Sequence, residues 1–140
     1  MVRLLSQMEH GCPTISAKDI PDLIPILAVA AAAKHGAVFT DIQRLRLKES
    51  DRIASIIAMI EVLGGKADAN ESALTIRGTG LAGGTVNACS DHRIAMSAAV
   101  ASTVCAGPVT ILGADCVKKS YPGFWEDFTR LGGKYEFYLR

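Results

Sequence analysis

The chain has 140 residues, of which 49% are hydrophobic and 21% charged, so it is long enough to bury one core and is not disordered. Its formal net charge of +1 excludes a general field that would hold nucleic acid or an anionic membrane, so anions must be recognised by locally placed charges. The longest apolar run, residues 23–33, has eleven residues, well short of the roughly 20 that span a bilayer. No secretory signal and no Cys-x-x-Cys pair is recognisable, so we expect a cytoplasmic protein with reduced, buried cysteines.

The first half of the chain predicts the order helix, strand, helix, strand, strand. A helix is expected over residues 22–35, ended by Gly36, and the strand AVFTDI (residues 37–42) follows it. Apolar residues then recur at helical spacing over residues 53–63. Residues 66–78, KADANESALTIRG, predict two short strands around a turn.

The second half predicts a similar order. A helix is expected from about residue 91 to 105, a strand over 108–112, a helix from near Pro122 and a final turn and strand over 130–139. The glycine-rich stretch GTGLAGGT, residues 78–85, lacks the Gly-Lys-Ser/Thr ending of a phosphate-binding loop and is expected to be a flexible connection.

The two halves resemble each other. HGAVFTDI around Gly36 matches AGPVTILG around Gly107, and VLGGK matches RLGGK. When Gly36 is aligned with Gly107, Lys48 falls on Lys119. The pattern predicts two copies of one unit packed around a shared interior, although two such segments can also resemble each other by chance.

Charged side chains gather at the starts of the predicted helices. They are, in chain order, Asp22, Lys48, Glu49, Arg52, His92, Arg93 and Lys119. Cations at a helix N-terminus are locally unfavourable by a few tenths of a kcal/mol, roughly, because that end is already positive. Their placement is explained if several helix starts converge on one anion.

The segment KESDR, which ends at Arg52, has two interpretations. Lys48 and Glu49 precede Arg52 by four and three residues, so the three side chains could share one helix face, with Glu49 as an acid. Alternatively, Ser50 or Asp51 caps the helix and the charges form a solvated rim. Spacing alone does not choose between them.

Two neighbouring features have ordinary explanations as well. Asp91 is expected to be a helix cap, and His92 beside it is more often a surface residue than part of a site. Lys119 next to another lysine is, by itself, a solvated pair. The sequence contains no His-Glu-x-x-His, no Cys or His metal spacing and no Gly-x-Ser-x-Gly, so no metal site is expected.

Four blocks taken together resemble the C-terminal part of the EPSP synthase family, the 3-phosphoshikimate 1-carboxyvinyltransferases. The blocks are IPDL (20–23), RLRLKESDRI (44–53), DHRIAMSAAVAS (91–102) and KKSYPGFWEDFTRLGG (118–133). Their order and spacing agree with the family from about residue 12 to 134. The tail YEFYLR matches nothing in the family pattern, and Arg44 stands where some members carry a smaller polar residue.

The resemblance implies an α/β (α+β) fold, the inverted α/β fold of the enolpyruvyl transferases. In that fold each of two domains has three βαβαββ units, and helix N-termini of both domains face a cleft. About two units are expected here, over residues 12–80 and 81–140, so that 1–140 is part of the C-terminal domain. The N-terminal domain would then be absent from this chain, and a fragment lacking it is expected to be inactive alone.

The resemblance also implies a reaction. Phosphoenolpyruvate would transfer its enolpyruvyl group to the 5-hydroxyl of shikimate 3-phosphate and release phosphate, with no metal or organic cofactor, in the pathway to chorismate and the aromatic amino acids. Asp22 would contact the shikimate hydroxyls and act as a base candidate, Lys48 would contact shikimate 3-phosphate, and Glu49 would protonate the methylene carbon. Glyphosate would be the expected inhibitor of the whole enzyme.

The same resemblance assigns the remaining charged residues to substrate binding. Arg52, Arg93 and Lys119 would hold the phosphate and carboxylate of phosphoenolpyruvate, with His92 at the edge of that pocket. One alternative is the related transferase that acts on UDP-N-acetylglucosamine, against which KESDR and DHRIAM argue. Another is a non-catalytic RNA-binding module, against which the near-neutral charge argues.

Overall fold

The computed structural model describes residues 2–137. The α-helices are α1 (Val2–His10), α2 (Ile24–Ala33), α3 (Arg52–Val62), α4 (His92–Ala101) and α5 (Phe124–Arg130). The 3-10 helices are η1 (Pro21–Leu23), η2 (Gln43–Leu47) and η3 (Ala114–Lys119). The strands are β1 (Thr14–Ser16), β2 (Gly36–Thr40), β3 (Ala67–Ala69), β4 (Ala73–Arg77), β5 (Gly84–Asn87) and β6 (Val109–Leu112).

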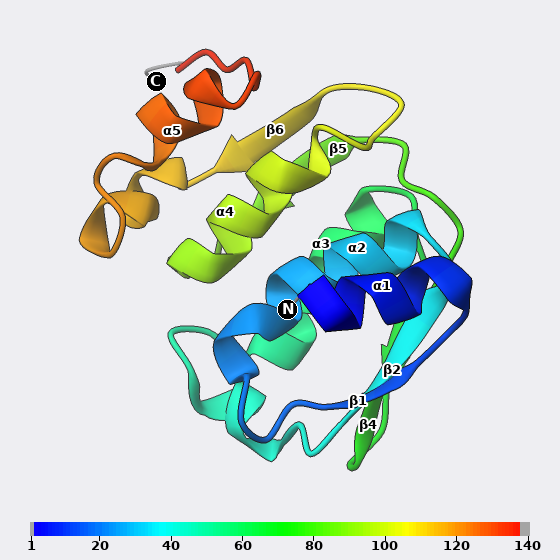
Figure 1. Ribbon diagram of the computed structural model, residues 1–140. Coiled ribbons are helices and arrows are strands. Elements are labelled where there is room, and N and C mark those ends of the chain that lie inside the picture. Colours follow the sequence, from blue (N-terminus) through cyan, green and yellow to red (C-terminus); the bar gives the residue numbers. More distant parts are fainter. Residues whose placement is uncertain (1, 138–140) are drawn as a thin grey trace.

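The strands form two sheets, and each sheet contains one pair of parallel strands. In the larger sheet, of order β1-β2-β4-β3, β1 runs parallel to β2, and β4 is antiparallel to both of its neighbours. In the smaller sheet β5 runs parallel to β6. Each parallel pair is connected through a helix, α2 in the first case and α4 in the second (Figure 1). The fold is therefore mixed α/β, as expected, with one strand-helix-strand-helix order repeated along the chain.

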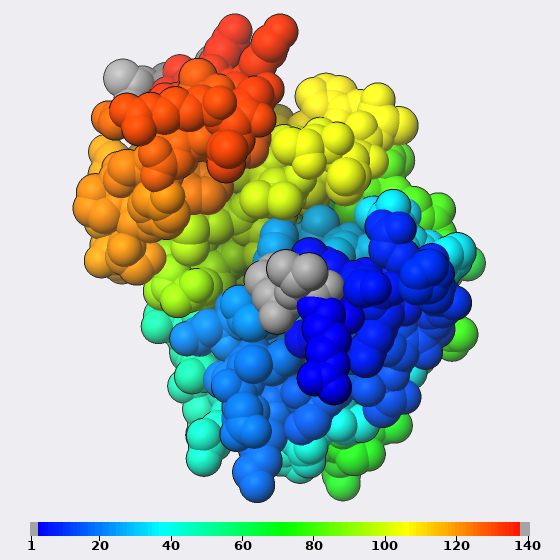
Figure 2. All heavy atoms as spheres, in the orientation of Figure 1, coloured from blue at the N-terminus to red at the C-terminus, as the bar shows by residue number. Residues whose placement is uncertain are grey.

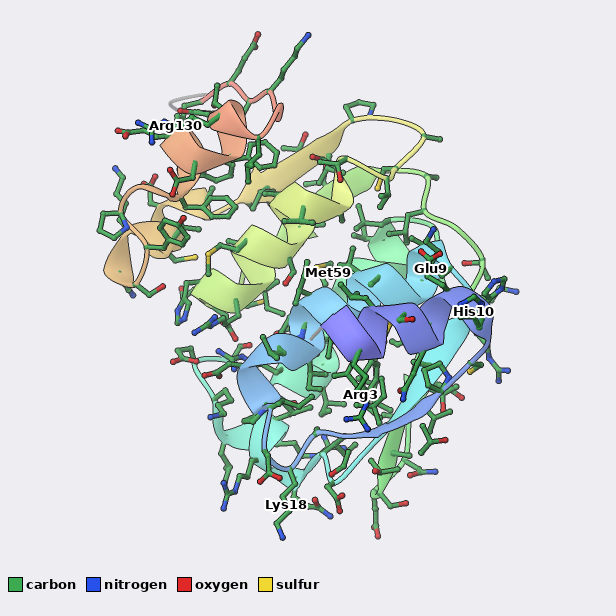
Figure 3. The ribbon with its side chains drawn as sticks, in the orientation of Figure 1. Arg3, Glu9, His10, Lys18, Met59 and Arg130 are labelled. Atoms are coloured by element: carbon green, nitrogen blue, oxygen red, sulfur yellow. The ribbon has the colours of Figure 1, made fainter. Side chains whose placement is uncertain are left out.

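Helix α2 lies at the centre of the main hydrophobic core. It is apolar on every side and contacts α1, α3, α4, β2 and β4, which is the environment that an all-apolar helix requires. Ile24, Leu27 and Ala31 on α2 pack with Phe39 of β2 in this core. Met59 is also buried, whereas Lys18 and Arg130 point outward at opposite ends of the molecule (Figure 3).

A smaller apolar cluster joins α4 to the C-terminal elements. It is built from Ala95, Ala99, Val117, Phe124 and Phe128, together with Ala88 and Cys116. Figure 2 shows the orange and red C-terminal residues gathered at one end of the molecule, away from the blue N-terminal ones. Helix α4 thus contributes to both clusters and links the two ends.

The glycine-rich stretch is not the flexible connection that its composition predicts. The amide of Gly80 donates to the carbonyl of Ala32 at 2.8 Å, and that of Ala82 donates to the carbonyl of Leu63 at 2.6 Å, so the segment is attached to the ends of α2 and α3. A Cβ at Gly78 would lie 2.4 Å from the carbonyl oxygen of Lys34. Glycine here permits close backbone approach, and the end of the stretch forms β5.

Two further expectations are wrong. The C-terminal strand does not form over residues 133–137, because Tyr135 and Phe137 pack their rings on Trp125, with centroids at 5.0 and 5.7 Å, instead of pairing their backbone with β6. The rest of that expected strand, residues 138–140, lies outside the described residues. The expectation that the cysteines are buried is wrong for Cys12 and Cys89, which are exposed because they lie in surface loops. All four cysteines are unpaired.

No helix in residues 2–137 combines the length and the apolar character needed to cross a membrane.

Candidate functional site

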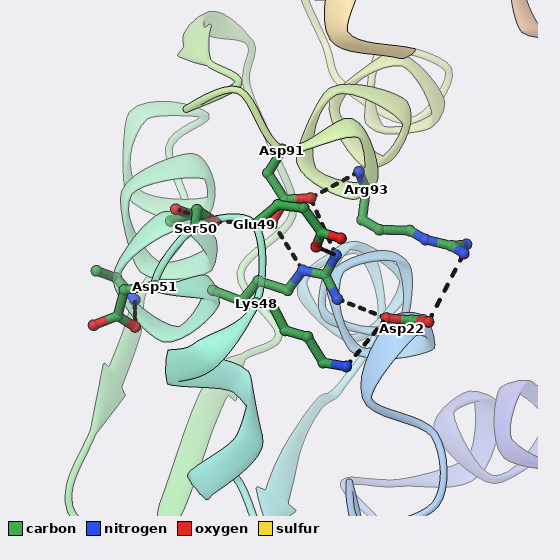
Figure 4. A network of polar contacts seen from close by, with 10 residues as sticks. Asp22, Lys48, Glu49, Ser50, Asp51, Asp91 and Arg93 are labelled. Atoms are coloured by element: carbon green, nitrogen blue, oxygen red, sulfur yellow. Dashed lines mark hydrogen bonds and ion pairs between the residues drawn. The ribbon is translucent and has the colours of Figure 1, made fainter. Parts of the chain in front are cut away.

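The starts of three helices meet at one place. Asp22 lies in η1, one turn before α2 proper; Arg52 is the first residue of α3; and Asp91 is the N-cap of α4. Helices α2, α3 and α4 pack against each other in all three pairs, so their N-terminal ends come together (Figure 4). The convergence of helix starts that the charge pattern predicts is therefore present.

The guanidinium of Arg52 is the centre of this cluster. Its Nε donates to Asp91 Oδ2 at 2.8 Å and its Nη2 donates to Asp91 Oδ1 at 3.2 Å. Nη1 donates to Asp22 Oδ1 at 2.7 Å, and Nη2 also donates to Glu49 Oε2 at 2.6 Å. Carboxylates from three separate segments therefore take up four of the five N–H groups of one arginine, which fixes the orientation of its plane.

The cluster has a buried floor and an open side. The side chains of Arg52 and Asp91 are 1% and 0% exposed, whereas those of Asp22 and Glu49 are 51% and 49% exposed. Burial by itself would lower the pKa of Arg52, but hydrogen bonds to Asp91 and Asp22 outweigh it and raise the pKa. Arg52 is thus a permanent cation beneath two carboxylates that reach solvent.

The two aspartates are held in their charged form. The hydrogen bond from Arg52 lowers the pKa of Asp22, against a smaller opposing effect of burial. Burial of Asp91 would raise its pKa, but hydrogen bonds from Arg52 and Ser50 outweigh this and lower it. Both carboxylates are therefore acceptors over the physiological pH range.

Lys48 and Arg93 flank the open side. Lys48 Nζ lies 3.9 Å from Asp22 Oδ1, and Arg93 Nη2 lies 3.9 Å from Asp22 Oδ2, so both ion pairs are long (Figure 4). The Nε of Arg93 is buried and has no hydrogen-bond partner among the described residues. These two cations are less fully paired than Arg52.

Each interpretation of the KESDR segment is right in one part and wrong in another. Glu49 does contact Arg52, and the segment does cap α3, but Arg52 is buried and belongs to no solvated rim. Asp51 is the N-cap of α3, and its Oδ1 accepts from the amide of Ala54 at 3.3 Å. Lys48 and Glu49 do not share a helix face with Arg52, because α3 begins only at Arg52. The loop that precedes the helix brings them to Arg52 instead.

His92 and Lys119 lie on elements that adjoin the Arg52 cluster. His92 is the first residue of α4 and Lys119 is the last of η3, which packs against α4. Within the described part of the chain, neither makes a hydrogen bond or ion pair with the cluster. Their expected roles therefore rest on the resemblance, not on a contact.

Sequence reasoning missed the second role of Asp91 and the role of Ser50. Asp91 caps α4 as predicted, since its Oδ1 accepts from the amide of Arg93 at 3.0 Å, but it is also the buried partner of Arg52. Ser50 Oγ donates to Asp91 Oδ2 at 2.8 Å. Asp91 lies about 40 positions after Ser50, and no local pattern shows that distant residues meet. The only available signal was the acidic residue directly before the His-Arg pair.

Comparison with known proteins now identifies the family. A sequence model of EPSP synthase (3-phosphoshikimate 1-carboxyvinyltransferase) matches residues 5–128. The chain belongs to the EPSP synthase family. It is 47% identical to the 3-phosphoshikimate 1-carboxyvinyltransferase of Clostridium kluyveri over 122 residues. These residues are 86% of this chain and 29% of that relative. The relative from Clostridium perfringens is 49% identical over 121 residues, which are 85% of this chain and 28% of that relative.

Solved structures agree with the sequence relatives. The EPSP synthase of Acinetobacter baumannii superimposes with a TM-score of 0.76 at 36% identity, over 81% of this chain and 27% of that one. The chain therefore has the fold of the family and spans less than a third of the length of the relatives it matches.

In this member of the EPSP synthase family, the Arg52 cluster combines helix N-termini with cationic side chains. No group of three or more His, Cys, Asp or Glu side chains in residues 2–137 is arranged to hold a metal ion. The three carboxylates of the cluster surround a guanidinium instead. Helix N-termini with adjacent cations form a surface on which phosphate or carboxylate groups bind favourably.

Proposed function

We propose that this chain forms one wall of the active site of an enzyme that transfers the enolpyruvyl group of phosphoenolpyruvate to the 5-hydroxyl of shikimate 3-phosphate. The observation that carries the proposal is the Arg52 cluster. Residues from the IPDL, KESDR and DHRIAM blocks, distant in sequence, meet there with their charged groups in contact. The family relationship identifies the substrates that such a cluster would bind.

The exposed carboxylates are the proton-transfer groups in this proposal. Glu49 reaches solvent and protonates the methylene carbon of phosphoenolpyruvate, while Asp22 contacts the shikimate hydroxyls and accepts the proton of the attacking one. Lys48, beside Asp22, contacts shikimate 3-phosphate close to the reacting hydroxyl. Proton transfer to carbon needs an acid that is held in position, and the 2.6 Å bond from Arg52 holds Oε2 of Glu49. The proton given to the substrate would be carried by the other oxygen, Oε1, in the protonated form of Glu49.

The binding cations are assigned on the same basis. The guanidinium of Arg93 makes only a long ion pair, and its side chain is 37% exposed, so it is available to a phosphate or carboxylate. Lys119 and His92 are assigned to the same binding region on the family relationship alone. Arg52 supplies positive charge from below, beneath the exposed carboxylates.

We also propose that this wall needs a facing wall from a further domain, and that the whole enzyme is cytoplasmic. The cluster by itself is electrically balanced, because three carboxylates oppose three cations: Asp22, Glu49 and Asp91 against Lys48, Arg52 and Arg93. A balanced wall has little surplus charge for a substrate with several negative charges. Further cations from an N-terminal domain would supply it. The unpaired cysteines are compatible with the cytoplasm.

A segment exchange tests the proposal. Residues 5–128 of this chain replace the matching segment of the Clostridium kluyveri relative, and the chimera is assayed with phosphoenolpyruvate and shikimate 3-phosphate. We expect the chimera to form product and release phosphate, and to restore growth of a bacterial strain that lacks the enzyme. The chain alone is expected to give no turnover.

The controls for this exchange are the folding of each protein and the identity of its substrate. Circular dichroism and thermal unfolding show whether the chimera is folded. A folded chimera without turnover would contradict the proposal, and so would turnover by the chain alone. Turnover with UDP-N-acetylglucosamine in place of shikimate 3-phosphate would indicate the related transferase instead.

A further inference from the structure

We propose that Ser50 is a positioning residue whose hydroxyl orients the Asp91–Arg52 pair and, through it, the acid Glu49. The inference rests on the proposed function, because it concerns the geometry of the same site. Ser50 carries no charge and is not expected to touch substrate. Its effect would pass through two side chains that are almost completely buried.

Ser55, Ser50 and Asp91 form a relay of two hydrogen bonds. The direction of each bond is determined by the number of protons available. A carboxylate only accepts, so Ser50 Oγ must donate its single proton to Asp91 Oδ2, at 2.8 Å. The contact of 3.0 Å between Ser55 Oγ and Ser50 Oγ therefore has Ser55 as the donor. The order is Ser55 to Ser50 to Asp91, with no alternative arrangement of protons while Asp91 is charged.

The carboxylate of Asp91 is held by four donors. Oδ2 accepts from Ser50 Oγ and from Arg52 Nε, and Oδ1 accepts from Arg52 Nη2 and from the backbone amide of Arg93. Three of these donors come from the segment at the start of α3 and one from α4. Among the described residues, the Ser50 hydroxyl is the one side-chain donor to Asp91 that does not belong to Arg52. With the Arg93 amide on Oδ1, it fixes the rotation of the carboxylate independently of Arg52.

The consequence reaches Glu49 through the rigid plane of the guanidinium. Nε and Nη2 of Arg52 follow the plane of the Asp91 carboxylate, and the same Nη2 holds Glu49 at 2.6 Å. A rotation of Asp91 would therefore turn Arg52 and displace Glu49. Because catalysis by a positioned acid is sensitive to displacements of about 1 Å, loss of the Ser50 hydroxyl should lower turnover more than binding.

The experiment uses three variants in the active chimera. Ser50→Ala removes the hydroxyl and is expected to lower kcat about tenfold, the scale of one hydrogen bond to a charged group, with KM for phosphoenolpyruvate within about twofold of the parent. Ser50→Thr retains a hydroxyl and should restore most of kcat. Ser102→Ala is the matched control, because Ser102 is similarly half-buried and bonds only the carbonyl of Ala99 in its own helix, at 2.6 Å.

The outcomes separate this inference from the proposed function. If the parent chimera is active and Ser50→Ala retains full kcat, positioning by Ser50 is refuted while the function stands. A Ser50→Thr variant that is folded but as slow as Ser50→Ala would refute it too, and so would an equal loss in Ser102→Ala. If Ser50→Ala does not fold, Ser55→Ala replaces it, with a smaller loss of kcat expected and an unchanged kcat counting against the relay.

Discussion

At the scale of single residues, Arg52 is a cation buried among carboxylates from three segments. Burying two opposite charges costs desolvation energy that can exceed their attraction, so such a pair adds little net stability. Removing one partner is different, because it leaves the other charge buried alone, at a cost of about 3–5 kcal/mol. The cluster therefore resists change at Arg52 and Asp91 for reasons that are separate from catalysis.

The pH dependence of stability should show this pairing. The pKa of Asp91 is lower in the folded chain than in the unfolded one, so its contribution is complete above the unfolded value of about 3.9 and is lost as the pH falls through the folded value. We expect the free energy of unfolding to decrease below about pH 4. Urea unfolding at a series of pH values measures it.

Two variants test whether Asp91 causes this pH dependence of the free energy of unfolding. Asp91→Asn should be destabilised at pH 7 by about 3 kcal/mol and should lose part of the acid dependence, because the charge that acid removes is already missing. Asp68→Asn, at an exposed position on β3, should leave the pH curve of the parent unchanged. A parallel acid dependence in parent and Asp91→Asn would show that other groups cause it.

In the active chimera, Glu49 should contribute to turnover, whereas Asp91 contributes to stability. Glu49→Gln keeps the size of the side chain but removes its proton chemistry, and turnover should fall by about 10²-fold or more while substrate binding is retained. Steady-state kinetics and binding titrations separate the two quantities. Glu61→Gln, at the exposed end of α3, serves as the control, and normal turnover of Glu49→Gln would exclude Glu49 as the acid.

At the scale of elements, helix α2 depends on small side chains. Its alanines allow α4 and α3 to approach closely, and Ala28 and Ala31 are fully buried. The same alanine-rich composition made α2 easy to recognise from the sequence. What it did not show is that Asp22 belongs to a separate 3-10 turn, η1, which turns the carboxylate toward Arg52.

Enlarging a buried alanine of α2 should disturb this packing. Ala31→Leu is expected to lower the free energy of unfolding by about 1–3 kcal/mol, because the added carbons have no free space. Chemical denaturation measures the change. Ala58→Leu on the exposed side of α3 is the control, with a change within about 0.5 kcal/mol. Equal effects at the two positions would contradict the close packing of α2.

Elements with strong local signals were predictable, and those with weak signals were not. Helices α2 to α5, strand β2 and the β3–β4 hairpin follow from periodicity and from the turn at Asn70, whose Oδ1 accepts from the amides of Ser72 and Ala73. Periodicity did not indicate α1, β1 or β5. Strands β1 and β5 each form beside a parallel partner, β2 and β6, so their extended conformation depends on a tertiary contact.

At the scale of the whole molecule, the repeat determines where charges meet. A 3-10 turn follows each parallel pair of strands, and a lysine lies at the end of each turn. η2 ends one residue before Lys48, and η3 ends at Lys119. The alignment of these two lysines along the sequence is thus matched by equivalent positions in the fold. The helix starts of the first half and of α4 then face one site.

The sequence alone determined the family, the order of the main elements and the residues that could carry charge to an anion, because motifs and periodicity are local properties of the chain. Only the tertiary structure decided which of these residues touch. The pairing of Arg52 with Asp91 and the relay through Ser50 join segments about 40 positions apart. Lys119 makes no hydrogen bond or ion pair with the cluster among the described residues, although its motif is equally clear. Such contacts depend on how α2, α3 and α4 pack, and helix packing is decided by the summed burial of many side chains rather than by any one motif.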